Sequence, residues 1–171
     1  RPLHQHGKRG FGTLHRAIQG IPLDGLAARL ADQLQEFAAA EALFKRAILR
    51  APQWSHPYAG LANLLARHTF GRLDEAEHEI RKSVEMEPGW ARAHDLLAVI
   101  LRLEGRMHDA EIEARRAIAL EPGNEDHYNN YANLLVQMSR LHEAEAQFRL
   151  AIEKDPDNAK PYYNLACLYV K

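Results

Sequence analysis

The chain has 171 residues, of which 46% are hydrophobic and 26% charged, and its 22 Lys and Arg residues balance 23 Asp and Glu residues to a formal net charge of −1. These values exclude a collagen-like or wholly disordered chain, and the balanced charge gives no reason to expect nucleic acid or a membrane surface as a partner. No run approaches about 18 consecutive apolar residues, so the sequence predicts no membrane span. The single cysteine, Cys167, excludes an internal disulfide and a multi-cysteine zinc site and fits a reducing, cytoplasmic compartment.

The amino-acid usage indicates an all-α protein. The chain contains 27 alanines and 23 leucines, whereas valine, isoleucine and threonine together number only 14. Alanine and leucine favour helices and β-branched residues favour strands, so we expect helices throughout.

Residues 1–20 differ in composition from the rest of the chain. They hold four basic residues, three histidines, four glycines and no acidic residue. We predict a basic, Gly- and His-rich segment in which Thr13 caps a short helix. That helix would cap the degenerate first unit or dock into the groove of this chain or of a neighbour; a third alternative is that the segment is a basic anchor for an acidic partner. His4 and His6 are too few ligands for a good metal site.

After residue 20, four series of residues recur in one register, with spacings of 34 to 36 positions. The series are Pro52, Pro88, Pro122 and Pro156; Ala40, Ala76, Ala110 and Ala144; Ala47, Ser83, Ala117 and Ala151; and Phe37, Leu73, Met107 and Leu141. Four series in one register indicate an internal repeat, and a repeat of this length determines the architecture.

The unit at 125–158 shows what one repeat consists of. In its first half, apolar residues fall on one face of a helix. These residues are Tyr128, Tyr131, Ala132 and Leu135. After a short turn the pattern starts again at Leu141, and Pro156 ends the second helix because proline cannot donate the helical hydrogen bond. Such a helix pair cannot bury its apolar face alone, so neighbouring pairs must stack.

The unit resembles the tetratricopeptide repeat (TPR), whose signature continues in Ala144, Phe148 and Ala151. The resemblance covers about 150 of the 171 residues. It divides them into a degenerate unit at 21–54, units at 55–90, 91–124 and 125–158, and a partial unit at 159–171, with a departure from the signature at His94. It implies an α-solenoid of helix-turn-helix repeats that forms a right-handed superhelix, with the first helices lining the concave face.

In TPR proteins, fixed positions of the first helices line the concave groove, and the resemblance carries these positions over to this chain. The predicted partner-binding residues are Asn63, Arg67, Arg92, Asp95, Leu96, Val99, Arg102, Asn129, Asn130, Asn133, Lys160 and Asn164. We prefer a mixed groove, in which Leu96, Val99 and Leu103 form an apolar strip with arginines nearby. Such a groove suits an amphipathic or extended segment with some acidity.

Two other interpretations of the groove depend on its asparagines. Asn130 and Asn164 occupy the same position in adjacent units, and a ladder of asparagines can bind an extended peptide backbone. This is similar to the TPR region of O-linked N-acetylglucosamine transferases, although Gly60 and Leu96 interrupt the series. The alternative is that asparagine is merely tolerated on a hydrated helix face. The carboxylate clamp of TPR cochaperones is not predicted, because Asn129 stands where that clamp needs a lysine.

The partial unit at 159–171 leaves an apolar face without a second helix to cover it. Its members are Tyr162, Leu165, Leu168 and Tyr169. Either the chain is a truncated piece of a longer protein, which we prefer, or another chain covers this face, such as a second copy in a homo-oligomer.

The sequence shows no Gly-rich phosphate loop, no HExxH and no nucleophile elbow, so no catalytic residue, metal or cofactor is predicted. We predict a non-enzymatic interaction scaffold that binds a peptide or protein segment in its concave groove. The alternatives are the substrate-targeting region of a larger enzyme, such as an O-linked N-acetylglucosamine transferase-like protein, and a self-assembling TPR protein.

Overall fold

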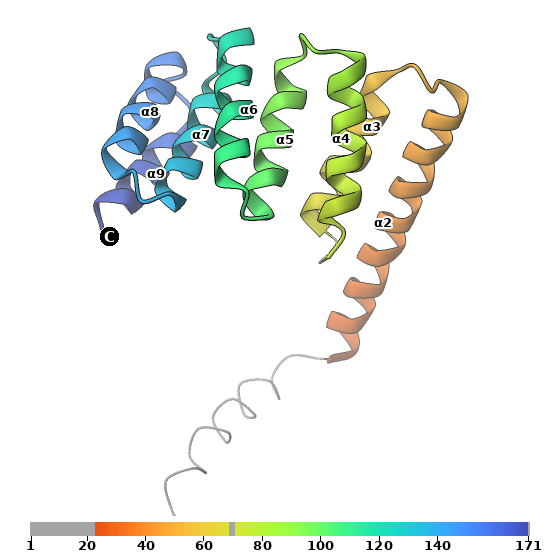
Figure 1. Ribbon diagram of the computed structural model, residues 1–171. Helices are drawn as coiled ribbons and strands as arrows, with labels where there is room; N and C mark the ends of the chain where they lie inside the picture. Colours follow the sequence, from red (N-terminus) through yellow and green to blue (C-terminus); the bar gives the residue numbers. More distant parts are fainter. Residues whose placement is uncertain (1–22, 69–70, 171) are drawn as a thin grey trace, which may run out of the picture. The chain divides into compact units, whose positions relative to one another are not determined.

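The structure is a computed structural model that describes residues 23–68 and 71–170 (Figure 1). The segment predicted at residues 1–20, with its helix capped by Thr13, lies outside the described residues. Within them all regular structure is helical, which confirms the predicted all-α fold. The helices are α2 (Leu23–Arg50), α3 (Ser55–His68), α4 (Leu73–Met86), α5 (Ala91–Leu103), α6 (Met107–Leu120), α7 (Glu125–Gln137), α8 (Leu141–Lys154) and α9 (Ala159–Tyr169).

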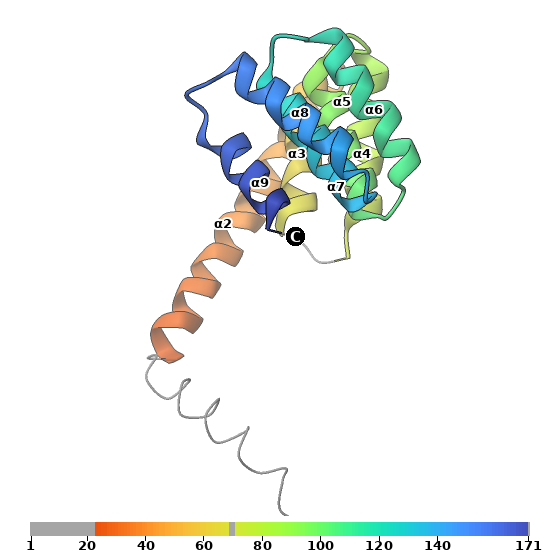
Figure 2. The same cartoon turned by 90° about the vertical axis from the view of Figure 1, so that its left-hand side faces the viewer.

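The chain divides into two units, residues 1–40 and 41–171, and the second contains the stacked helices. There α3 packs on α4, α5 on α6 and α7 on α8, and successive pairs contact each other through α4 with α5, α6 with α7 and α8 with α9. Figures 1 and 2 show these helices as a row of hairpins stacked side by side. This stack is the predicted solenoid of helix pairs.

Residues 23–50 form the single helix α2, within the segment that the sequence predicts to be a degenerate unit at 21–54. The positions of the second-helix signature, Ala40, Phe44 and Ala47, lie on this helix. From residue 26 to residue 50 the segment contains neither glycine nor proline and is rich in alanine and leucine. Nothing in its local sequence breaks the helix where a unit would need a turn.

The close contacts within the pairs depend on alanine. Ala76, Ala110 and Ala144 occupy the same position in α4, α6 and α8, and each is 0% exposed. A methyl side chain allows two helix backbones to approach closely, and a larger side chain at these positions would overpack the contact. The repeat of alanine in the sequence therefore reflects a steric requirement that is met again in each pair.

A second recurring feature ties each of the helices α3, α5 and α7 to the proline turn before it. Tyr58 Oη donates a hydrogen bond of 3.0 Å to the carbonyl of Pro52, and Tyr128 does the same to Pro122. His94, which departs from the TPR signature, stands at the same position, and its Nε2 lies 3.0 Å from the carbonyl oxygen of Pro88. The imidazole thus makes the same contact as the tyrosines in the neighbouring units.

Arginines tie each helix pair to the preceding one. The N-cap residues of α4, α6 and α8 are Arg72, Arg106 and Arg140. Each contacts an acidic residue in the first turn of its own helix and a glutamate on an earlier helix, which is α2, α4 or α6 respectively. We call each such set a charged clamp. The glutamates are Glu41, Glu77 and Glu111, and the residue four positions after each, Lys45, Arg81 and Arg115, contacts the same carboxylate.

The clamp at Glu111 is the most complete of the three. Arg140 Nη1 lies 2.6 Å from Glu111 Oε2, while Arg115 Nη2 (2.7 Å) and the Tyr131 hydroxyl (2.8 Å) donate to Glu111 Oε1. Burial would raise the pKa of Glu111, but the hydrogen bonds from Arg140, Tyr131 and Arg115 outweigh it and lower the pKa to about 2. The carboxylate is therefore ionised whenever the protein is folded near neutral pH.

The turn between α7 and α8 contains a serine with a positive backbone angle. Ser139 has φ 60°, and Gly105 at the equivalent place between α5 and α6 has φ +81°. Replacing Ser139 with glycine is expected to raise the free energy of unfolding by about 1 kcal/mol, because glycine adopts this conformation without steric strain. Chemical denaturation measures the change. Gly105→Ser is the matched reverse substitution and should lower the free energy of unfolding; changes of the same sign in both variants would contradict the argument.

Candidate functional site

The residues predicted to bind a partner lie on the first helices α3, α5, α7 and α9, which contact one another in that order. We call the surface that these helices share the first-helix face. Helix α3 contributes Asn63 and Arg67; α5 contributes Arg92, Asp95, Leu96, Val99 and Arg102; α7 contributes Asn129, Asn130 and Asn133; and α9 contributes Lys160 and Asn164. The structure places these residues on neighbouring helices. The part of the side chain that a partner could reach differs from residue to residue.

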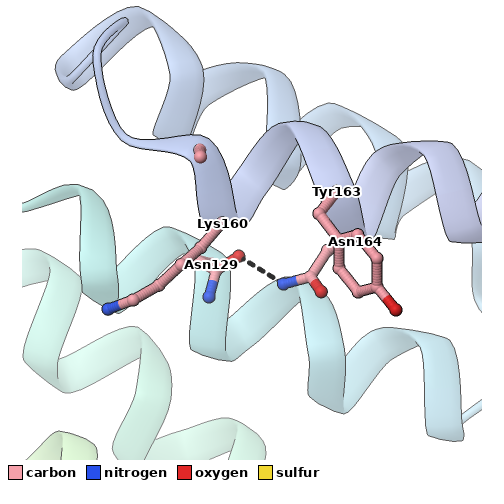
Figure 3. Close-up of a pocket in the computed structure, with 5 residues that line it drawn as sticks. Asn129, Lys160, Tyr163 and Asn164 are labelled. Carbon is pink, nitrogen blue, oxygen red and sulfur yellow. Dashed lines mark hydrogen bonds between the residues drawn. The ribbon is translucent and has the colours of Figure 1, made fainter.

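Two equivalent hydrogen bonds connect adjacent first helices, one between α5 and α7 and one between α7 and α9. Asn130 Nδ2 donates to Asp95 Oδ2 at 2.8 Å, and Asn164 Nδ2 donates to Asn129 Oδ1 at 2.8 Å. Figure 3 shows the second of these bonds, between α7 and α9. The asparagine series thus has a structural role, because Asn130 ties α7 to α5 and Asn164 ties α9 to α7.

This role determines which asparagines can still form hydrogen bonds with a bound segment. Asn129 is only 6% exposed, so it supports Asn164 and offers little surface of its own. Asn130 and Asn164 are half-buried, and among the described residues neither Oδ1 atom has a hydrogen-bond partner. An amide oxygen in this position can still accept a hydrogen bond from the backbone N–H of a bound segment. Asn133 donates from Nδ2 to the carbonyl of Asn129, at 3.0 Å.

The series of asparagines is interrupted at Gly60 for a steric reason. A Cβ atom added at Gly60 would collide with the ring of Phe44, so a side chain at this position would require the ring to move. At Leu96, the same position in the next unit, the side chain packs against the hydrophobic core. The asparagine ladder therefore covers only the α7 and α9 end of the first-helix face.

A hollow of about 470 Å³ lies at that end of the face. Its lining comes from Asn129 on α7 and from Ala159, Lys160, Tyr163 and Asn164 on α9 (Figure 3). Lys160 Nζ is 3.5 Å from Asp126 Oδ1, and Tyr163 is 71% exposed. The hollow thus offers a cation, an aromatic ring and an amide to a bound segment.

The predicted apolar strip lies on α5. Leu96 and Val99 are half-buried, and Leu103 is 46% exposed. Arg102 follows Val99 by three positions on the same helix and is half-buried as well. Burial lowers the pKa of the Arg102 guanidinium, and no carboxylate of the described residues lies at ion-pair distance from it. A partly desolvated cation without a counter-ion, next to an apolar strip, is a binding position for an acidic group.

A buried histidine, which the sequence analysis did not identify, contacts the carboxylate of Asp95. His127 is 2% exposed; its Nε2 lies 3.0 Å from Glu121 Oε2 and its Nδ1 3.6 Å from Asp95 Oδ2, an ionic contact rather than a hydrogen bond. Burial would lower the pKa of His127, but the carboxylates of Asp95 and Glu121 outweigh it and raise the pKa. Glu121 and His127 lie six residues apart, but Asp95 comes from a separate segment, so no local pattern in the sequence indicates its contact with His127.

Two further properties of the described residues concern ligands and membranes. No three His, Cys, Asp or Glu side chains among them are grouped so that they could hold a metal ion. None of the described helices combines the length and the apolar character needed to cross a lipid bilayer.

Known proteins share this arrangement. Tetratricopeptide repeat family models match residues 127–158 and 148–171. Among solved structures, TTC0263, a thermophilic TPR protein of Thermus thermophilus, has a TM-score of 0.74 and 25% identity, over 92% of this chain and 87% of that chain. YrrB, a TPR protein with an unusual peptide-binding site, has a TM-score of 0.60 and 22% identity, over 84% and 73%. The first TPR of Spaghetti (RPAP3), bound to the HSP90 peptide SRMEEVD, has a TM-score of 0.62 and 19% identity, over 69% and 92%.

No curated protein sequence matches the chain. A stack of helix pairs that presents one continuous face of first helices defines an α-solenoid repeat protein. The family models and the shared fold then point to one family: residues 127–171 match the tetratricopeptide repeat, and the chain has the fold of tetratricopeptide-repeat proteins.

Proposed function

We propose that this chain is a protein-interaction scaffold whose first-helix face binds an extended or amphipathic segment with apolar side chains and an acidic group. The scaffold contributes preorganisation, because the stacked helices hold polar and apolar groups at fixed spacing before the partner arrives. The proposal assigns no chemical step to this chain.

Arg102 is the observation that carries the proposal. Its guanidinium is partly desolvated without a neutralising carboxylate among the described residues, so the unbound state bears a free-energy cost that an incoming acidic group removes. Leu103, 46% exposed on the same helix, offers an apolar contact next to that charge. The Oδ1 atoms of Asn130 and Asn164, which have no partner among the described residues, add acceptors for the backbone of the bound segment.

Two of the similar structures support a peptide as the partner. The Spaghetti (RPAP3) TPR was solved with the HSP90 peptide SRMEEVD, and YrrB has a peptide-binding site, as described above. Both show that a stack of this kind can serve as a peptide receptor, and neither identifies the segment that this chain would bind.

Selection of peptides on the immobilised chain from a random phage-displayed library tests the proposal. We expect the selected peptides to share an acidic residue beside apolar ones. Arg102→Glu should weaken their binding about tenfold or more, since it replaces the attraction between opposite charges with repulsion. Fluorescence anisotropy of labelled peptides measures the dissociation constants.

Arg116→Glu is the matched control, because it makes the same charge change at an exposed arginine on α6, outside the first-helix face. Its binding should stay within about twofold of the unmodified chain. Selected peptides without an acidic residue, or equal losses in the two variants, would overturn the assignment of the site.

A further inference from the structure

The junction between α5 and α7 contains a buried titratable group that the proposed function does not use. It is His127, and the equivalent residues of the other first helices are Pro57, Ala93 and Pro161. Those three residues are buried and cannot carry a charge, whereas the imidazole of His127 is 2% exposed and lies between two carboxylates. Since a buried polar group costs free energy unless its partners compensate for it, packing alone does not require a histidine at a position that accepts proline or alanine elsewhere.

Each ring nitrogen of His127 faces a carboxylate from a different helix. Nε2 lies 3.0 Å from Oε2 of Glu121, the C-cap residue of α6, and Nδ1 lies 3.6 Å from Oδ2 of Asp95 on α5. Helix α7 also packs against α8 and α9, but no charged group in the described parts of those two helices pairs with His127. Asp95 and Glu121 are therefore the two charges to which the imidazole responds.

The geometry around His127 satisfies both carboxylates only when the ring is protonated. A neutral imidazole carries one N–H and one lone pair. With its hydrogen on Nε2, the lone pair of Nδ1 faces Asp95; with its hydrogen on Nδ1, the lone pair of Nε2 faces Glu121. The imidazolium presents an N–H to each. His127 Nδ1 and Asp95 Oδ1 are buried and have no hydrogen-bond partner among the described residues, so no other contact of these two atoms would compensate for the loss of the proton.

The protonation of His127 also reaches the first-helix face through Asp95. The oxygen that His127 contacts, Asp95 Oδ2, accepts the 2.8 Å hydrogen bond from Asn130 Nδ2. His127 and Asn130 are three positions apart on α7 and so lie on the same side of that helix. Helix α7 thus holds the carboxylate of α5 through two side chains, one of which can gain or lose a charge.

We infer that His127 is a proton-dependent link between the units at 91–124 and 125–158. As an imidazolium it attracts Asp95 on α5 and Glu121 at the end of α6. As a neutral imidazole it turns a lone pair toward one of these carboxylates, and the contact between the two units weakens. The link lies within the stack and does not depend on the proposed function.

The link predicts that the protein loses stability as the pH rises. Burial alone would lower the pKa of His127, but Asp95 and Glu121 raise it above its ordinary value of 6.5. A histidine of this kind contributes its full stabilisation below 6.5 and loses it as the pH rises through the folded value. Urea denaturation should therefore show the free energy of unfolding falling over that range. In His127→Gln, which has no imidazole to titrate, this part of the fall should be absent.

A pH titration followed by NMR tests the link directly, because long-range ¹H–¹⁵N correlations of the imidazole report the protonation of His127. Its midpoint should lie above 6.5. Asp95→Asn, which replaces the carboxylate with an amide of similar shape, should lower that midpoint. Asp109→Asn makes the same charge change in the first turn of α6, at the opposite end of that helix from Glu121, and should leave the midpoint unchanged. The side-chain amide signals of Asn130 should shift with the midpoint of His127, since both residues contact Asp95 Oδ2.

A midpoint at or below 6.5 in the unmodified chain would overturn the inference, as would equal effects of Asp95→Asn and Asp109→Asn on that midpoint. The same conclusion would follow if the stability of His127→Gln depended on pH as that of the unmodified chain does. If His127→Gln does not fold, the NMR titrations of the unmodified chain and of Asp95→Asn still decide the question. None of these measurements involves a partner or Arg102, so their failure is distinguishable from a failure of the proposed function.

Discussion

Replacing Phe148 with alanine is expected to lower the free energy of unfolding by about 3–5 kcal/mol, because it removes a large side chain from a closely packed site and leaves a cavity. Phe148 lies on α8, is 0% exposed, and belongs to the same hydrophobic cluster as Tyr131 and Leu168. In a repeat protein each unit is stabilised mainly by its neighbours, so the loss should concentrate in α7, α8 and α9. Chemical denaturation measures the total, and amide hydrogen exchange locates it.

Ile112→Ala is the control for this prediction, because Ile112 is an aliphatic residue of α6 that is 54% exposed. We expect a change within about 0.5 kcal/mol. A loss of less than about 1 kcal/mol for Phe148→Ala, or equal losses of hydrogen-exchange protection along all the helices, would show that α8 does not pack as described.

Acidification is expected to destabilise the protein through Glu111. The folded protein holds the pKa of Glu111 at about 2, against its ordinary value of 4.5. A carboxyl group whose folded pKa is depressed contributes stability above the unfolded value, and the contribution is lost as the pH falls from about 4.5 to about 2. At about 1.4 kcal/mol per pKa unit, the difference corresponds to about 3 kcal/mol. Glu111→Gln should remove most of this contribution at pH 7 and change little at pH 2.

Urea denaturation of the unmodified chain and of Glu111→Gln at several pH values between 7 and 2 measures this effect. Glu143→Gln is the matched control, because Glu143 contacts the same arginine, Arg140, but its side chain is 53% exposed. We expect a smaller loss for the control, since solvent screens an exposed pair. If the free energy of unfolding depended on pH in the same way for the unmodified chain and for Glu111→Gln, the pH effect could not be assigned to Glu111.

Much of the fold could be predicted because its signals are local or strictly periodic. Pro122 and Pro156 follow the ends of α6 and α8, as expected of a residue that cannot donate the helical hydrogen bond. Ala144 and its equivalents Ala76 and Ala110 recur at the repeat spacing, and these residues are fully buried. Such features recur in the sequence because each helix pair must meet the same packing requirement.

Polar contacts between units were harder to predict. Arg106 and Arg140 recur at the repeat spacing, so a periodic signal for the charged clamps was present in the sequence. That signal does not say which carboxylate each arginine reaches, since a long charged side chain can point along its own helix or across to a neighbour. Asn129 illustrates the same difficulty: its position on the first-helix face was predictable, whereas its burial beneath Asn164 was not.

The residue pattern alone established the helix pairs, their order and the faces that pack, because these follow from apolar periodicity and from proline and alanine at fixed intervals. Packing in three dimensions decided the accessibility and charge state of the polar groups. It tied Asn130 to Asp95 and left Arg102 partly desolvated without a counter-ion among the described residues. These outcomes depend on distances between helices that are far apart along the chain, and desolvation and ion pairing are properties of those distances rather than of any single segment.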